Sequence, residues 1–354
     1  MLTKIPSAFF LLQKEIFIVY ISMLTAFDEN KKLINLLENR PESLKGKYFC
    51  PACRSELSLK NGAIKTPHFA HKSLQACDLA LENESAQHLG LKKELYEWFK
   101  QDEKVEIERY LPALNQRPDL LVNDKIAIEI QCSYLSLKRL KERSENYRQH
   151  GYRVLWLMGK DLWMQERLTE LQKNLLYFSE NRGFYYWELD LEKQKLRLKS
   201  LIHEDLQGHL LYLTDEFSFK KAPLLSLLRR PYQRQKLQSI TVPKGQSSER
   251  FIRQQLFHRS AKWLKIQEIY YQKGENLLTK NFQKSFFAPP GLNLLTVSKL
   301  ELPSVNFCQI TQNISEYYQN FWENFTEKYT ENLYPPRFYA IMKERENEKN
   351  QVKA

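Results

Sequence analysis

The chain lacks several features that would place it in well-known functional classes. It has no internal repeat, no glycine-rich loop of the kind that holds nucleotide phosphates, and no helicase signature. Its five cysteines in 354 residues do not suggest a disulfide framework, which favours a reducing compartment. These absences argue against a P-loop protein and against a secreted one.

Long hydrophobic runs are also missing, although the N-terminus contains two short ones. Residues 9–12 and 16–21 are apolar, but the polar residues 13–15 separate them, so neither piece can span a bilayer. We expect residues 1–22 to be a non-native extension and translation to start at Met23. A membrane anchor is the alternative interpretation.

Positive charge is abundant and localised. The formal net charge is +12, and residues 220–280 hold fourteen Lys and Arg against three acids. This excess predicts an anionic partner, most simply nucleic acid. Aromatic residues lie among the charges near helical spacing, so we expect several of them in a core. The side chains predicted to bind DNA in this segment are Arg229, Arg230, Arg253, Arg259 and Lys262.

Two carboxylates lie on a predicted hairpin near the middle of the chain. Asp119 opens a short apolar run, and after a turn a second run alternates so that Glu129 and Gln131 share one face of a strand. Adjacent strands lie only about 5 Å apart, so facing carboxylates could share a divalent cation. The pattern resembles the PD-(D/E)xK nuclease superfamily, with Gln131 where its commonest members carry Lys.

The residues around this hairpin fit the order of elements in that superfamily. We expect a helix over 85–100, a strand over 105–111, the hairpin, a basic helix over 136–150 ended by Gly151, and a buried strand over 152–158. A strand, helix, strand passage of this length indicates a parallel crossover and hence an α/β core with a mixed sheet flanked by helices.

A second pattern lies upstream. Cys50 and Cys53 form a CxxC pair, and after fourteen residues His68 and His71 form an HxxH pair. Two thiolates and two imidazoles suit tetrahedral Zn²⁺, and four filled positions indicate a structural site. Cys77 is expected to be a buried thiol outside the ligand set.

Taken in order, these motifs resemble the CoiA family of competence proteins from naturally transformable Gram-positive bacteria. The resemblance covers roughly residues 23–160, and implies a cytoplasmic protein that helps imported single-stranded DNA recombine, with the RecA-type machinery as partner. It is carried by the CxxC and HxxH pairs, the segment Glu84 to His88, Arg117 to Asp119, Glu129 to Gln131, Arg143 with Tyr147, Gly151 and Trp156.

Under the nuclease interpretation, Asp119 and Glu129 hold Mg²⁺ or Mn²⁺, with Glu84, or less favourably His88, as an extra ligand or orienting group. Arg143 and Tyr147 lie four residues apart on a helix and are expected to contact the DNA backbone; a surface pair is the alternative. Gln131 can orient water but cannot transfer a proton as Lys can. A catalytically silent nuclease fold that binds DNA or recombinase is the competing hypothesis.

The chain is long enough for more than one domain. The expected division is a zinc-binding module over 23–80, a nuclease-like domain over 81–165 and a basic, mainly helical C-terminal domain over 166–354.

Overall fold

A computed structural model describes residues 22–39, 46–62, 67–72, 77, 85–243, 248–279, 286–292, 295, 305–327 and 331–351. The chain divides into two compact units, residues 1–84 and 85–354. The expected extension 1–22 lies outside the described residues apart from Ser22. None of the helices in the described ranges has the length and apolar character that a bilayer crossing requires.

The first unit is a six-stranded antiparallel sheet with the order β1-β6-β5-β4-β2-β3. Its apolar side chains, among them Leu57 and Phe69, form a core that also contains Cys50 and Cys77. The strands are β1 Ser22–Met23, β2 Thr25–Phe27, β3 Leu33–Asn35, β4 Tyr48–Phe49, β5 Glu56–Lys60 and β6 His68–His71.

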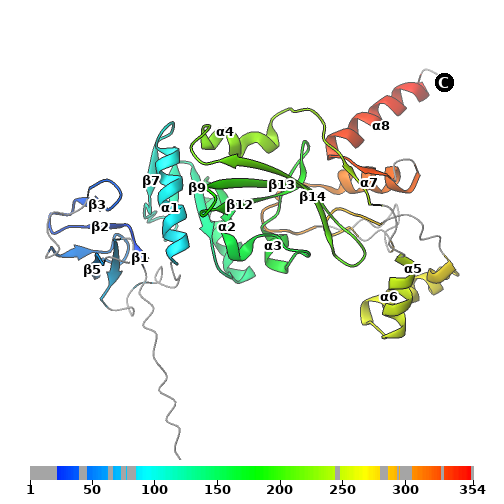
Figure 1. Ribbon diagram of the computed structural model, residues 1–354, viewed down its shortest axis with the longest axis horizontal. Helices are drawn as coiled ribbons and strands as arrows, with labels where there is room; N and C mark the ends of the chain where they lie inside the picture. Colours follow the sequence, from blue (N-terminus) through cyan, green and yellow to red (C-terminus); the bar gives the residue numbers. More distant parts are fainter. Residues whose placement is uncertain are drawn as a thin grey trace, which may run out of the picture. The chain divides into compact units, whose positions relative to one another are not determined.

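The second unit contains an eight-stranded mixed sheet (Figure 1), whose main path runs β14-β13-β12-β10-β9-β8-β7. Its first half has the expected element order of helix, three strands, helix and strand. These elements are α1 Ala86–Phe99, β7 Val105–Ile107, β8 Leu120–Val122, β9 Ile126–Gln131, α2 Leu137–Gln149 and β10 Arg153–Met158.

Local signals explain these boundaries. The side chains of Ser85 and Ser136 accept hydrogen bonds from backbone N–H groups in the first turns of α1 and α2. Gly151 after α2 has a φ of 77°, which glycine adopts without steric cost. Strands β9 and β10 pair in parallel, which confirms the predicted crossover through α2.

The same sheet continues past residue 165, where the sequence predicted a domain boundary. Strand β12 pairs in parallel with β10, and β13 and β14 extend the sheet as far as Ser218. The nuclease-like half and the strands after it therefore share one sheet (Figure 1). The added elements are η2 Lys160–Leu162, α3 Glu170–Asn174, β11 Tyr177–Ser179, β12 Gly183–Asp190, β13 Lys195–Glu204 and β14 Leu210–Ser218.

From Leu224 onward the described residues are mainly helical. Aromatic side chains of α7, including Tyr317 and Phe321, pack with Phe184 of β12 in one large core. The elements are α4 Leu224–Arg229, η3 Arg230–Tyr232, β15 Ile240–Thr241, α5 Ser248–Phe257, α6 Ala261–Gln272, η4 Leu277–Thr279, α7 Ser315–Glu327, β16 Asn332–Leu333 and α8 Pro336–Gln351.

Candidate functional site

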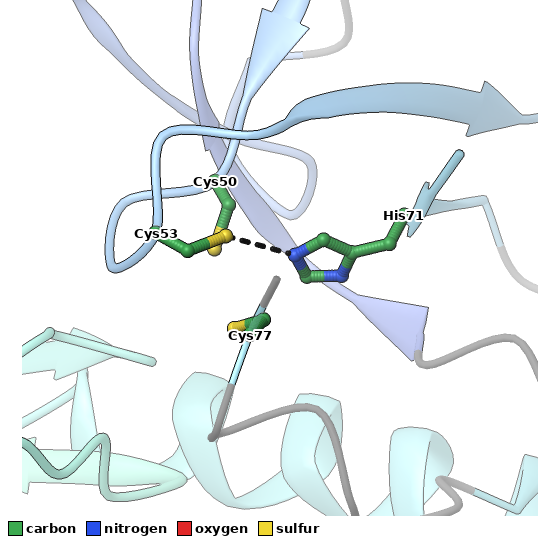
Figure 2. A group of neighbouring side chains, drawn as sticks. All are labelled: Cys50, Cys53, His71 and Cys77. Atoms are coloured by element: carbon green, nitrogen blue, oxygen red, sulfur yellow. Dashed lines mark hydrogen bonds between the residues drawn. The ribbon is translucent and has the colours of Figure 1, made fainter. Parts of the chain in front are cut away.

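A cluster of three cysteines and one histidine lies in the first unit (Figure 2). Cys50 and Cys53 lie at either end of the turn between β4 and β5, His71 ends β6, and Cys77 follows. Their ligand atoms all lie within 4.8 Å of one another. Tetrahedral Zn²⁺ with Zn–S bonds of about 2.3 Å places its ligand atoms roughly 3.8 Å apart. The cluster could therefore hold a metal ion with little movement.

The structure does not place the expected ligand His68 in this cluster. His68 and His71 lie three residues apart on strand β6. Side chains on a strand alternate between its faces, so residues three apart point in opposite directions. Cys77, expected to be a buried thiol outside the site, lies in the cluster instead.

Hydrogen bonds within the cluster favour the thiolate form of Cys50 and raise the pKa of His71, so a metal ion would replace the proton of the imidazole. A side-chain hydrogen bond from Cys77, with further hydrogen bonds from His71 and the backbone, outweighs burial and lowers the pKa of Cys50 to about 3. The Cys53 sulfur lies 3.4 Å from Nε2 of His71. Because the thiolate is the form that binds metals, this arrangement presents Cys50 already deprotonated.

The predicted carboxylate centre lies where β8 and β9 pair. Asp119 lies in a bend just before β8, and Leu120 pairs with Ile128, so Asp119 and Glu129 come next on the two strands. The backbone N–H of Ile130 donates to Oδ2 of Asp119 at 2.8 Å. The hairpin thus places both carboxylates at the same level of the sheet, as the sequence predicts.

Asp119 is held by helix α1, which packs on β7, β8 and β9. Nε2 of His88 lies 3.1 Å from Oδ2 of Asp119, and Nζ of Lys92 lies 3.0 Å from Oδ1. Burial alone would raise the pKa of Asp119, but His88, Lys92 and the N–H of Ile130 together hold it well below its usual range. Asp119 is therefore ionised and already paired with positive charge.

Lys92 also contacts a second buried acid. Its Nζ lies 2.8 Å from Oε1 of Glu108, and both side chains are only 1% exposed. Glu108 has a φ of 51°, a left-handed conformation that is uncommon for a residue other than glycine. An ammonium group with no access to water, between two carboxylates, needs such pairing to remain charged.

Glu129 is held by helix α2. Its Oε1 accepts hydrogen bonds from Nη2 of Arg143 and from the hydroxyl of Tyr147, each at 2.6 Å. Burial and the nearby Glu129 charge raise the pKa of Tyr147 well above its usual value. Arg143 and Tyr147 were expected on the DNA backbone, but Tyr147 is fully buried and both instead bind Glu129.

The remaining predicted groups of this centre are placed as follows. Gln131 is mostly buried, and its Nε2 donates to the carbonyl oxygen of Ser133 at 2.9 Å. Glu84 lies outside the described residues. His88, which the sequence offered as a less favoured alternative to Glu84, contacts Asp119. Within the described ranges, Asp119 and Glu129 do not join a third histidine, cysteine or acid in one ligand cluster.

The predicted basic DNA contacts differ in accessibility. Arg229, Arg253, Arg259 and Lys262 are exposed, and Arg253 forms an ion pair with Glu249. Arg230 is only partly exposed, and its guanidinium lies over the ring of Phe217, 5.1 Å from the ring centre. Four of these five cations can therefore reach a ligand in solution.

Three residues of these two clusters were not predicted as site residues from the sequence. Cys77 was recognisable only as an additional cysteine close to the CxxC pair. Lys92 lies four residues after His88 on the buried face of α1, between Leu89 and Leu95. A lysine within an apolar helical stripe is a signal of a buried ion pair, but its partner Glu108 shows no comparable pattern.

Comparison with known proteins gives a consistent result. A family model described as "Competence protein CoiA, nuclease-like domain" matches residues 84–232, and one described as "Competence protein CoiA, N-terminal domain" matches residues 33–80. Competence protein CoiA of Bacillus subtilis (strain 168) is 40% identical over 117 residues. That alignment covers 32% of this chain and 31% of the Bacillus protein. No solved structure matches.

Proposed function

The chain belongs to the CoiA family of competence proteins, and from this premise we propose that it is a metal-dependent DNA nuclease acting in natural transformation. The observation that carries the proposal is the placement of Asp119 and Glu129 at one level of the paired strands β8 and β9. In this interpretation the unit 85–354 contains a PD-(D/E)xK core.

Asp119 and Glu129 would hold Mg²⁺ or Mn²⁺, for which carboxylate oxygens are the preferred ligands. The bound ion would activate water and neutralise charge on the phosphate. The protein's own groups position this centre. His88 and Lys92 fix Asp119 and keep it ionised, and Arg143 and Tyr147 fix Glu129. Gln131 would orient water by hydrogen bonding, without taking up its proton.

A second candidate function is a nuclease fold that binds DNA or recombinase without cutting. It is favoured by the pairing of each carboxylate with protein cations, Asp119 with Lys92 and Glu129 with Arg143. These protein cations offset the negative charge of the two carboxylates, which is the charge that would attract a metal ion. In this alternative the centre stabilises the fold, and binding to DNA relies on the basic surface of the C-terminal helices.

The same proposal covers partners and location. Imported single-stranded DNA and recombination intermediates are the substrates, the RecA-type machinery is the protein partner, and the cytoplasm is the compartment. The cluster of Cys50, Cys53, His71 and Cys77 would hold a structural Zn²⁺.

The test is cutting of single-stranded, duplex and branched DNA by the purified full chain with Mg²⁺ or Mn²⁺. Asp119→Asn and Glu129→Gln keep the shape of each side chain and remove its charge. We expect either substitution to lower the rate by on the order of 10²-fold or more, because metal-ion catalysis contributes several kcal/mol. Asp124→Asn is the matched control, since Asp124 lies exposed in the turn of the same hairpin and Asn tolerates its φ of 55°.

Loss of cutting in Asp119→Asn and Glu129→Gln, with unchanged tryptophan fluorescence and an active Asp124→Asn, would support the nuclease. Cutting that persists in all three variants would locate the activity elsewhere or in a contaminant. No cutting by any form, with DNA binding retained, would favour the silent module.

A further inference from the structure

Helices α5 and α6 form a small substructure with its own core. Trp263, Ile266 and Tyr270 of α6 pack with Ile252 of α5 and with Leu277, and all five side chains are buried. A turn at residues 258–260 joins the two helices, drawn in yellow in Figure 1. The inward faces of α5 and α6 therefore pack into this core, and their outward faces point away from it.

Large apolar side chains lie on these outward faces. Phe257 is 83% exposed, Tyr271 is 59% exposed and Leu264 is 42% exposed. Leu264 and Tyr271 lie two turns apart on one stripe of α6, and Phe257 ends α5. None of these three side chains belongs to the buried core of the pair. The exposed rings of Phe257 and Tyr271 are accessible to a partner.

Cations surround these rings. On α5, Arg250, Arg253 and Phe257 follow a three- and four-residue spacing and so share one stripe. On α6, Lys265 is exposed and lies next to Leu264 on the outward side of the helix. The two helices contain only two acids, Glu249 and Glu268. The surface is therefore positively charged and also carries accessible aromatic faces.

We infer that the outward faces of α5 and α6 bind single-stranded DNA, with bases stacking on Phe257 and Tyr271 and phosphates contacting Arg253, Arg259 and Lys265. Charge complementarity selects a nucleic acid over an apolar protein partner. Unpaired bases offer their faces for stacking, whereas a duplex hides them. The inference rests on and deepens the DNA binding proposed for the C-terminal helices, and it requires neither Asp119 nor Glu129.

The test is fluorescence anisotropy of a labelled single-stranded oligonucleotide and of a duplex of the same sequence, titrated with the full chain without added Mg²⁺ or Mn²⁺. Phe257→Leu and Tyr271→Leu keep an apolar side chain and remove the aromatic face. We expect each to weaken binding of the single strand by about 5- to 150-fold and to change duplex binding much less. Phe257→Trp should preserve the affinity of the wild-type protein.

Circular dichroism of each variant verifies that α5 and α6 remain folded. Wild-type affinity of the leucine variants, or an equal loss on single strand and duplex, would overturn the inference. A surface that docks another protein would tolerate leucine at both positions and would also show no dependence of single-strand binding on these rings. This experiment measures binding and not cutting. Its result therefore does not depend on whether the protein is a nuclease, and a negative binding result would not disprove the nuclease proposal.

Discussion

Replacing Cys77 with serine will remove zinc from the N-terminal unit, whereas replacing His68 with alanine will leave the zinc content unchanged. The ligand atoms of Cys50, Cys53, His71 and Cys77 all lie within 4.8 Å of one another. Structural zinc contributes about 10–16 kcal/mol in small metal-binding peptides, so its loss will unfold this unit. The affinity of Cys77→Ser for zinc should fall by more than roughly 10- to 100-fold, which is the effect of replacing a residue that only hydrogen-bonds to a metal ligand.

The measurement is metal content by mass spectrometry after dialysis against a weak chelator, with proteolysis of the first unit as a second readout. Wild type and His68→Ala should retain one zinc per chain and resist proteolysis. Zinc retained by Cys77→Ser and lost by His68→Ala would restore the CxxC and HxxH set that the sequence predicted.

Replacing Lys92 with methionine will lower the free energy of unfolding of the second unit by about 3–5 kcal/mol. The ammonium group lies 2.8 Å from Glu108 and 3.0 Å from Asp119, and its side chain is 1% exposed. Methionine fills a similar volume but leaves two carboxylates buried without this cation. A typical domain is stable by only about 5–15 kcal/mol, so the loss is a large part of the total.

Urea denaturation followed by tryptophan fluorescence measures this effect selectively, because all six tryptophans lie between residues 98 and 322. Lys93→Met is the matched control, since Lys93 is its neighbour on α1 and its ion pair with Glu97 is about half exposed. That control should change stability by less than about 1 kcal/mol. If Lys92→Met also lowered the free energy of unfolding by less than about 1 kcal/mol, the buried network of Lys92, Glu108 and Asp119 would not stabilise the fold.

Local signals in the sequence were sufficient to predict the elements around the carboxylate centre. Ser85 and Ser136 cap α1 and α2, and Gly151 follows α2 with a positive φ. The alternation of Ile126 to Gln131 places Glu129 on the predicted strand. Each of these features depends on residues within a few positions of one another, which is why the sequence alone could show them.

Other parts depend on contacts between distant residues. The HxxH spacing suits two ligands on a turn or helix, but β6 is a strand, and strand alternation turns His68 away from the cluster. The strands after residue 165 were partly predicted, yet their pairing with β10 through Met158 and Glu188 has no local signature. The partners of Asp119 and Glu129 come from α1 and α2, which only the folded chain brings to the hairpin.

The two proposed functions differ in what the carboxylates of Asp119 and Glu129 bind, a metal ion or only the cations of the protein. Lys92 and Arg143 stabilise the carboxylates in the described structure. A catalytic centre requires Asp119 and Glu129 to exchange part of this pairing for a metal ion. Direct measurement of metal binding separates the two possibilities without knowledge of the preferred DNA substrate.

The most direct test of the central claim is therefore a Mn²⁺ titration of the full chain, followed by electron paramagnetic resonance of the free ion. The cysteine-rich cluster does not compete, because Mn²⁺ prefers oxygen ligands. The nuclease proposal predicts a Mn²⁺ site that is lost in Asp119→Asn and in Glu129→Gln and kept in Asp124→Asn. Mn²⁺ binding that is absent from the wild-type protein, or equal in all of these variants, would contradict a catalytic metal at Asp119 and Glu129.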